Sequence, residues 1–181
     1  MRITTEDTLA LIIDFQEKLV PVIEQNEELI HNTEILLKGL KELQIPMIIT
    51  QQYTKGIGMT VPVLAELFEE SFHYEDKVSF SCAKDEAILA RIKAQGKKNI
   101  LICGIEAHIC VLQTVIDLIA LGYNVLLVED CVGSRKESNR RIGIRRALQE
   151  GALSTSYEAV LFELTQTAKA DTFKAISRLV K

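Results

Sequence analysis

Cys110 is the residue of this chain whose type and place best suit covalent chemistry. It lies in GIEAHICV, directly after the apolar run NILIC. If a helix begins there, unpaired backbone N–H groups and the helix dipole would lower the pKa of the thiol and favour the thiolate. The competing interpretation is a small buried apolar residue, the usual fate of a free cysteine, and Cys82 and Cys103 fit it better. Cys110 is therefore a candidate nucleophile.

A thiol nucleophile needs a base or a cation beside it, and three other residues could provide one. Asp14 ends the apolar run LALII, where it is either a helix N-cap or a functional carboxylate. Lys77, in HYEDKVSFS, is a surface lysine if considered alone, but it could serve the thiol. His108 is close to Cys110 in sequence, so a Cys–His pair is also open.

Metal and cofactor motifs are absent from the sequence. Gln51, Gln52 and Tyr53 follow the apolar run PMIIT, without the clustered His, Asp or Cys of a metal site. The glycines at 56–58 lack the third glycine and the following helix of a dinucleotide fingerprint, and no GxxxxGK loop occurs. We therefore expect no metal and no cofactor.

The elements that would position these residues form a strand–helix alternation. Continuous apolar runs are typical of parallel strands covered on both faces, and ligands bind beyond the carboxyl ends of such strands. We predict strands at 9–14, 46–50, 99–103, 124–128 and 153–156, with a short one at 77–80. We predict helices at 27–43, 84–95, 108–121, 137–150 and 168–180. This pattern predicts an α/β fold with helices on both faces of an open sheet.

Composition limits the function classes. The chain has 181 residues, 25% of them charged, and a net charge of -4, so we expect one globular domain over residues 1–181 and no nucleic-acid or membrane partner. The stretch MRITTEDTLALIIDFQ is unlike a secretory signal, and no apolar segment approaches a membrane span. Four cysteines without CxxC spacing then indicate reduced thiols in a cytoplasmic protein.

Five segments follow one another along the chain: LIIDFQEKL, TQQYTKGIG, EDKVSFSC, GIEAHICVLQTVIDL and STSYEAVLFEL. In their order and spacing they resemble the isochorismatase-like cysteine hydrolases, a superfamily that includes nicotinamidases. The resemblance covers nearly the whole chain. It implies a six-stranded parallel Rossmann-like sheet and a catalytic triad on Asp14, Lys77 and Cys110. It also implies a cis peptide before Ala107, with the N–H groups of Ala107 and Cys110 forming an oxyanion hole. Metal-bearing members carry Asp and His ligands where Gln51, Gln52 and Tyr53 stand here.

The resulting hypothesis is a metal-independent hydrolase of a small amide, imide or ester, working through a thioester. Phe15, Tyr53, Phe80 and His108 are candidates for lining the substrate pocket or for simple packing. A thiol-based redox sensor, a phospho-receiver using Asp14, and a non-catalytic binding protein are the alternatives.

Resemblance to oligomeric proteins also implies a homo-oligomer. The cluster at 135–146, rich in Arg and Lys, is interpreted as a solvated helix face or subunit contact, with Arg140 or Arg145 near the interface, and less well as an anion site. Its proposed complement is the acidic segment 66–76.

Overall fold

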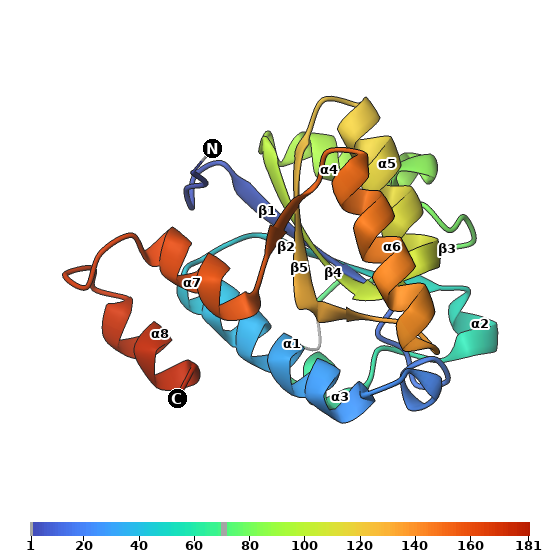
Figure 1. Cartoon of the computed structure of the whole chain (residues 1–181), viewed down its shortest axis with the longest axis horizontal. Helices are drawn as coiled ribbons and strands as arrows, with labels where there is room; N and C mark the ends of the chain where they lie inside the picture. Colours follow the sequence, from blue (N-terminus) through green and yellow to red (C-terminus); the bar gives the residue numbers. More distant parts are fainter. Residues whose placement is uncertain (1, 70–71) are drawn as a thin grey trace.

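The computed structural model describes residues 2–69 and 72–181, and within them the chain forms one six-stranded parallel sheet (Figure 1). The strand order is β3-β2-β1-β4-β5-β6. The strands are β1 (Thr8–Ile13), β2 (Met47–Gln52), β3 (Glu75–Lys77), β4 (Asn99–Ile105), β5 (Asn124–Gly133) and β6 (Leu153–Thr155). The predicted α/β architecture with a parallel sheet is confirmed.

Helices cover both faces of this sheet (Figure 1). One face packs against α1 (Asn26–Glu42), α7 (Tyr157–Thr165) and α8 (Phe173–Leu179), and the other against α4 (Glu86–Ala94), α5 (Leu112–Ala120) and α6 (Glu137–Gln149). Two short helices, α2 (Thr54–Ile57) and α3 (Pro62–Ala65), lie between β2 and β3. None of the helices that the structure describes is long and apolar enough to cross a membrane.

The apolar runs form strands because each buries both of its sides. In β1, Leu9 and Leu11 join the core under α4, α5 and α6, whereas Ala10 and Ile12 join the core under α1, α7 and α8. Alternate side chains point to opposite faces of a strand, so a strand covered on both faces must be apolar throughout. This arrangement leaves the ends of the strands as the place for polar side chains.

Two boundaries differ from the sequence prediction. The edge strand β3 ends at Lys77 rather than beginning there, because the chain turns at residues 79–81, where the Ser79 hydroxyl donates to the Ser81 carbonyl at 2.9 Å. Near the C-terminus, the segment after β6 forms a separate helix, α7, which the sequence analysis did not predict. Its N-cap is Ser156, whose hydroxyl accepts from the Ala159 N–H at 3.2 Å.

Gly104 allows β1 and β4 to lie close together at their carboxyl ends. It pairs with Ile13 in the sheet and has a φ of 147°, and an added Cβ would lie 2.5 Å from the Ile13 carbonyl oxygen. A side chain does not fit in that space. Asp14 follows Ile13 directly, so the first candidate residue emerges beside the segment that leads to Cys110.

Candidate active site

Asp14 forms a fully buried ion pair with Lys77. The Lys77 Nζ lies 2.7 Å from Asp14 Oδ2, and neither side chain is exposed to solvent. The Thr50 hydroxyl donates to the other carboxylate oxygen, Oδ1, at 2.7 Å. The carboxylate therefore accepts from side chains at the ends of β2 and β3, and the interpretation of Asp14 as a helix N-cap is wrong.

Lys77 is held on several sides, so it is not a surface lysine. Besides Asp14, its Nζ donates to Gln52 Oε1 at 2.7 Å and to the carbonyls of Phe80 and Ser79 at 3.2 and 3.3 Å. Burial, the largest single effect, would lower the pKa of Lys77, but the negative charge of Asp14 together with Cys82, Cys110 and the hydrogen bond to Asp14 outweighs it, and the pKa is raised. Lys77 is therefore a fixed cation and not a proton acceptor.

The backbone turn after β4 brings Cys110 to this ion pair. Residues Ala107–Val111 form a π-helical turn that leads into α5, and Cys110 is 7% exposed. The charges of Asp14 and Lys77 both act on the pKa of its thiol. The structure thus brings together Asp14, Lys77 and Cys110 from the ends of three different strands.

The pKa of the Cys110 thiol is raised, which corrects the expectation that a helix start would lower it. Burial is the largest cause and the charge of Asp14 the next, while the charge of Lys77 acts in the opposite direction. The thiol is therefore protonated at neutral pH. A nucleophilic thiolate would form only if a base takes the proton, and Asp14 is the carboxylate whose charge acts on this thiol.

The cis peptide lies one bond earlier than the resemblance implied. It joins Ile105 to Glu106, not Glu106 to Ala107. The residues that follow hold the turn together, since the Glu106 carbonyl accepts from the Ile109 and Val111 N–H groups at 3.0 and 3.3 Å. The position of a non-proline cis bond leaves no mark in an amino-acid sequence.

Several residues that the sequence analysis did not assign support the site. Gln52 Nε2 donates to the Val78 carbonyl at 2.8 Å, which turns its Oε1 toward Lys77. Thr114 links two segments: its hydroxyl accepts from the Cys82 N–H at 3.0 Å and donates to the Cys110 carbonyl at 2.7 Å. Glu106 accepts from the Arg135 N–H and Nε at 3.1 Å. Only the place of Gln52 at the end of a predicted strand could have indicated its role.

The four candidates for pocket lining have different surroundings. Phe15 is fully buried in the core under α1, α7 and α8. Tyr53 and Phe80 are each 53% exposed, and Phe80 lies in the turn whose carbonyls hold Lys77. His108 is partly buried, with its Nδ1 2.9 Å from the Ser134 hydroxyl. The Nδ1 atom of this imidazole is therefore engaged with Ser134.

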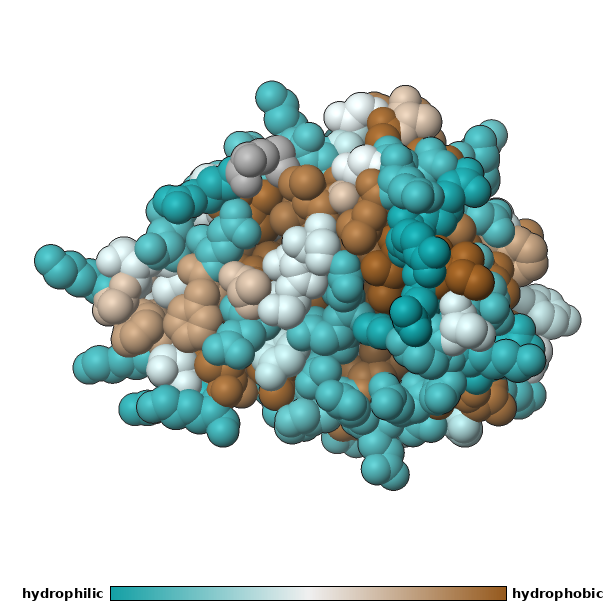
Figure 2. All heavy atoms as spheres, in the orientation of Figure 1, coloured by the Kyte–Doolittle hydropathy of each residue, from teal (hydrophilic) through white to brown (hydrophobic). Residues whose placement is uncertain are grey.

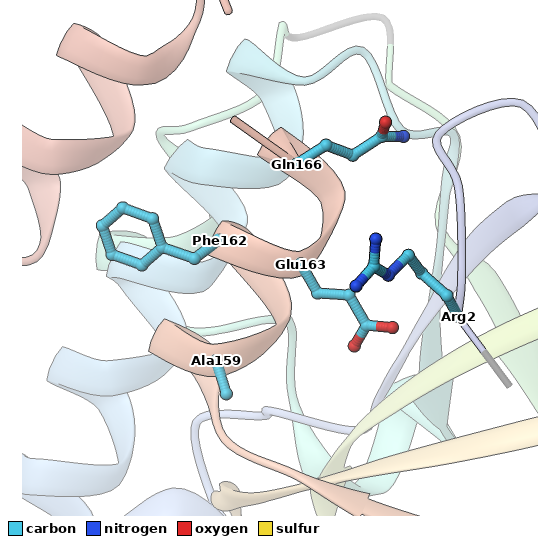
Figure 3. A pocket seen from close by; sticks show the side chains of 5 residues that line it. All are labelled: Arg2, Ala159, Phe162, Glu163 and Gln166. Atoms are coloured by element: carbon cyan, nitrogen blue, oxygen red, sulfur yellow. The ribbon is translucent and has the colours of Figure 1, made fainter. Parts of the chain in front are cut away.

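No metal-binding group was found among the residues that the structure describes: they hold no cluster of three or more His, Cys, Asp or Glu side chains. A depression of about 640 Å³ lies elsewhere, between the N-terminal segment and α7. In Figure 3 the Arg2 and Glu163 side chains extend toward each other there. Its lining residues are Arg2, Ala159, Phe162, Glu163 and Gln166, none of them a thiol or hydroxyl nucleophile.

Comparison with known proteins identifies the family. A model of the isochorismatase domain matches residues 8–159, which include every residue of the site just described. The chain belongs to the isochorismatase family. The Isochorismatase domain-containing protein 2 of Danio rerio is 37% identical over 180 residues, covering 99% of this chain and 89% of that relative.

Solved structures of the isochorismatase family share the fold. A structure of the MAR1 ribonuclease from Caenorhabditis elegans has a TM-score of 0.93 and 35% identity, covering 99% of this chain and 92% of that chain. The YcaC gene product of Escherichia coli, described as an octameric hydrolase of unknown specificity, has a TM-score of 0.91 and 25% identity, with 99% and 89% covered. Membership of this family indicates a hydrolase.

Proposed function

We propose that this protein is a metal-independent cysteine hydrolase that cleaves a small amide, imide or ester through a thioester intermediate. The observation that carries the proposal is the buried Cys110 thiol beside a carboxylate that is itself paired with a buried lysine. A nucleophile, its base and a fixed cation in contact are the parts of an activated thiol. The substrate-binding role of Tyr53, Phe80 and His108 belongs to the same proposal.

In the first step, Asp14 takes the proton of Cys110 as the sulfur attacks the substrate carbonyl. The raised pKa of the thiol means that attack and proton transfer are coupled, so no standing thiolate is required. The charge that develops on the carbonyl oxygen is stabilised by the N–H groups of Ala107 and Cys110, and losing one such donor costs about 2.7–4 kcal/mol of barrier.

In the second step, Asp14 returns the proton to the leaving nitrogen or oxygen, which departs and leaves an acyl thioester on Cys110. Water then attacks the thioester with Asp14 again as the base, giving the acid product and the free thiol. Lys77 keeps its proton throughout and holds Asp14 in place through the 2.7 Å ion pair.

A panel of small amides, ureides and esters tests this proposal. We expect turnover of at least one member, a covalent acyl adduct on Cys110 in the intact mass, and loss of both in Cys110→Ala. Cys103→Ala is the matched control, because that buried thiol packs in the core under α1, α7 and α8, on the other face of the sheet from Cys110. Turnover by Cys110→Ala at the rate of the unmodified chain would refute the mechanism.

Two alternatives have distinct outcomes in the same assays. The name of the Caenorhabditis elegans neighbour suggests ribonuclease activity as an alternative. However, Lys77 is buried and paired with Asp14, so it is not free to bind a phosphodiester. Cleavage of RNA that survives in Cys110→Ala would favour it. A redox sensor requires an accessible thiol of low pKa, and burial raises the pKa of Cys110. Rapid oxidation by dilute peroxide would favour the sensor.

The proposal includes a cytoplasmic location and a homo-oligomeric state. A catalytic thiol has to stay reduced, and Cys82, Cys103, Cys110 and Cys131 are all free. This agrees with a cytoplasmic location. The octameric Escherichia coli neighbour supports a homo-oligomer.

A further inference from the structure

Gly143 stands in the middle of α6, and its backbone conformation does not require glycine. It is a buried helical residue whose φ lies outside the left-handed range. A glycine inside a helix costs about 1 kcal/mol relative to alanine. What favours glycine at this position is therefore the space around it.

That space is closed by the backbone of the turn that carries the nucleophile. A Cβ added at Gly143 would lie 2.7 Å from the Ala107 carbonyl oxygen and 2.8 Å from both the Ala107 carbonyl carbon and the His108 Cα. These are backbone atoms, so they cannot rotate away as the end of a side chain can. Helix α6 and the turn Ala107–Val111 thus touch backbone to backbone.

Helix α6 is held from other directions, so it cannot easily move to admit a methyl group. One turn before Gly143, Arg140 donates to the carbonyls of Val132 at 2.8 Å and Glu129 at 2.5 Å, both in β5. After Gly143, the side chains of Ile144 and Ala147 are buried in the core between α6 and the sheet. Figure 1 shows α6 running alongside α5 on this face. An added methyl group would therefore displace the turn.

We propose that Gly143 is a positioning residue that sets the place of the Ala107 and Cys110 N–H groups in the oxyanion hole. This inference rests on the proposed hydrolase function and adds a specific role for α6. Oxyanion donors act at about 2.7–3.1 Å from the oxygen they stabilise. A displacement of a few tenths of an ångström would therefore weaken them, whereas Asp14 and Lys77 lie outside the turn and stay in place. Attack by the Cys110 sulfur at a saturated carbon needs no such donors.

The test compares two reactions of Cys110. Acetylation by p-nitrophenyl acetate passes through an oxyanion: the sulfur adds to the carbonyl, the thiol proton passes to a base, and p-nitrophenolate leaves. Alkylation by iodoacetamide displaces iodide at a saturated carbon, so no oxyanion forms. We expect Gly143→Ala to slow acetylation at least tenfold and to change alkylation less than threefold.

Gly39→Ala is the matched control. Gly39 is another buried glycine inside a helix, α1, and its added Cβ would meet the end of the Leu161 side chain at 2.5 Å, on the face opposite α6. We expect it to change stability and to leave the ratio of acetylation to alkylation as in the unmodified chain. A Gly143→Ala ratio equal to that of the unmodified chain would overturn the inference.

Two further outcomes have to be distinguished from this result: no acetylation of the unmodified chain, and failure of Gly143→Ala to fold. If the unmodified chain is not acetylated on Cys110, the proposed function itself fails, and the role of Gly143 fails with it. If Gly143→Ala does not fold, Arg140→Gln replaces it, because that change releases α6 from β5 without adding a Cβ. The same ratio should then fall at least threefold, and an unchanged ratio would overturn the inference.

Discussion

The Lys77 ammonium and the Asp14 carboxylate meet at 2.7 Å with neither side chain exposed to solvent. An ion pair buried so completely depends on both members, because either one alone would be a charge out of water. The pair therefore matters for the fold as well as for the proposed mechanism, and a variant of either residue has to be measured for stability as well as for activity.

Asp14→Asn should lower the free energy of unfolding by about 3–5 kcal/mol, since it leaves the Lys77 charge buried without its partner. Asn suits the backbone here, because Asp14 has a φ of 58° and Asn tolerates that left-handed conformation. Loss of the base should also slow acylation of Cys110 by about 10²–10⁴-fold. Urea unfolding and acylation rates check the two effects.

The control for Asp14 is Asp117→Asn. Asp117 lies 3.7 Å from Lys84, whose side chain is 69% exposed, and surface pairs contribute about 0–1 kcal/mol. Equal stability losses in the two variants would contradict the importance given to burial of the Asp14–Lys77 pair.

Lys77→Met should raise the pKa of Cys110 further. The charge of Lys77 opposes the effects of burial and of Asp14 on that thiol, and removing the charge removes the opposition. Each unit of pKa reduces the thiolate fraction about tenfold at a fixed pH below it. The pH profile of iodoacetamide alkylation should move to higher pH. Lys84→Met should leave the profile in place, and an unmoved profile in Lys77→Met would count against an effect of the Lys77 charge on the thiol.

The free energy of unfolding should fall above about pH 8.5, the ordinary pKa of a thiol in the unfolded chain. Burial raises the pKa of Cys82 to about 11 and also raises the pKa of Cys103 and Cys131. The unfolded chain then releases protons that the folded chain keeps, so stability is full below pH 8.5 and is lost as the pH rises. Each thiol contributes about 1.4 kcal/mol per pH unit in that window.

Urea unfolding at pH 7, 8, 9 and 10 measures this slope. Cys103→Ala should make it shallower while lowering stability at pH 7 through the cavity it leaves. A free energy that stays constant from pH 8 to 10 would contradict burial of these thiols in the folded protein.

Thr114→Val should destabilise the protein by about 1–3 kcal/mol, because it leaves the buried Cys82 N–H without its acceptor. Thr33→Val is the control: the Thr33 hydroxyl donates to the Leu29 carbonyl at 2.7 Å within α1. We also expect Thr114→Val to slow acylation more than Thr33→Val, since Thr114 holds the Cys110 carbonyl. Thermal unfolding and acylation rates of the two variants measure these differences, and equal values for both variants would contradict the prediction.

Oligomer formation is the last prediction. Figure 2 shows a hydrophilic stripe along α6 with apolar side chains beside it, and Ile142 on this helix is 58% exposed. Arg140 is occupied within its own chain by β5 carbonyls, so the exposed Arg145 is the better position to vary. Light scattering should give a multiple of 20.3 kDa, and Arg145→Glu should lower that mass. A monomer would refute the prediction.

The sequence predicted the interior of the sheet because continuous apolar runs have one main explanation, a strand covered on both faces. It predicted the limits of β3 poorly, since that edge strand ends where backbone carbonyls turn toward Lys77. For Cys110, a position at the start of a helix predicts a lowered pKa of the thiol. Burial and the neighbouring Asp14 carboxylate, which only the folded structure brings together, have the larger effect.

The pairing of Gln52 with Lys77 and the contact of Gly143 with Ala107 were not predictable. In both cases the residues are far apart in the chain, and nothing in either residue type indicates its partner. The resemblance to a family did align Asp14, Lys77 and Cys110, because three short motifs kept their order and spacing.

The neighbours of β1 govern how the site assembles during folding. Its residues Thr8–Ile13 pair with Asn99–Gly104 of β4, so the chain has to close a loop of roughly 90 residues before that contact forms. Asp14 and Lys77 lie at the ends of β1 and β3, which are on the same side of the β1–β4 contact in the sheet. Cys110 follows β4 and reaches them only when β4 pairs with β1. We expect Cys110 to be an accessible thiol before β4 docks, and pulse labelling with a thiol reagent during refolding would follow the moment at which Cys110 joins Asp14 and Lys77.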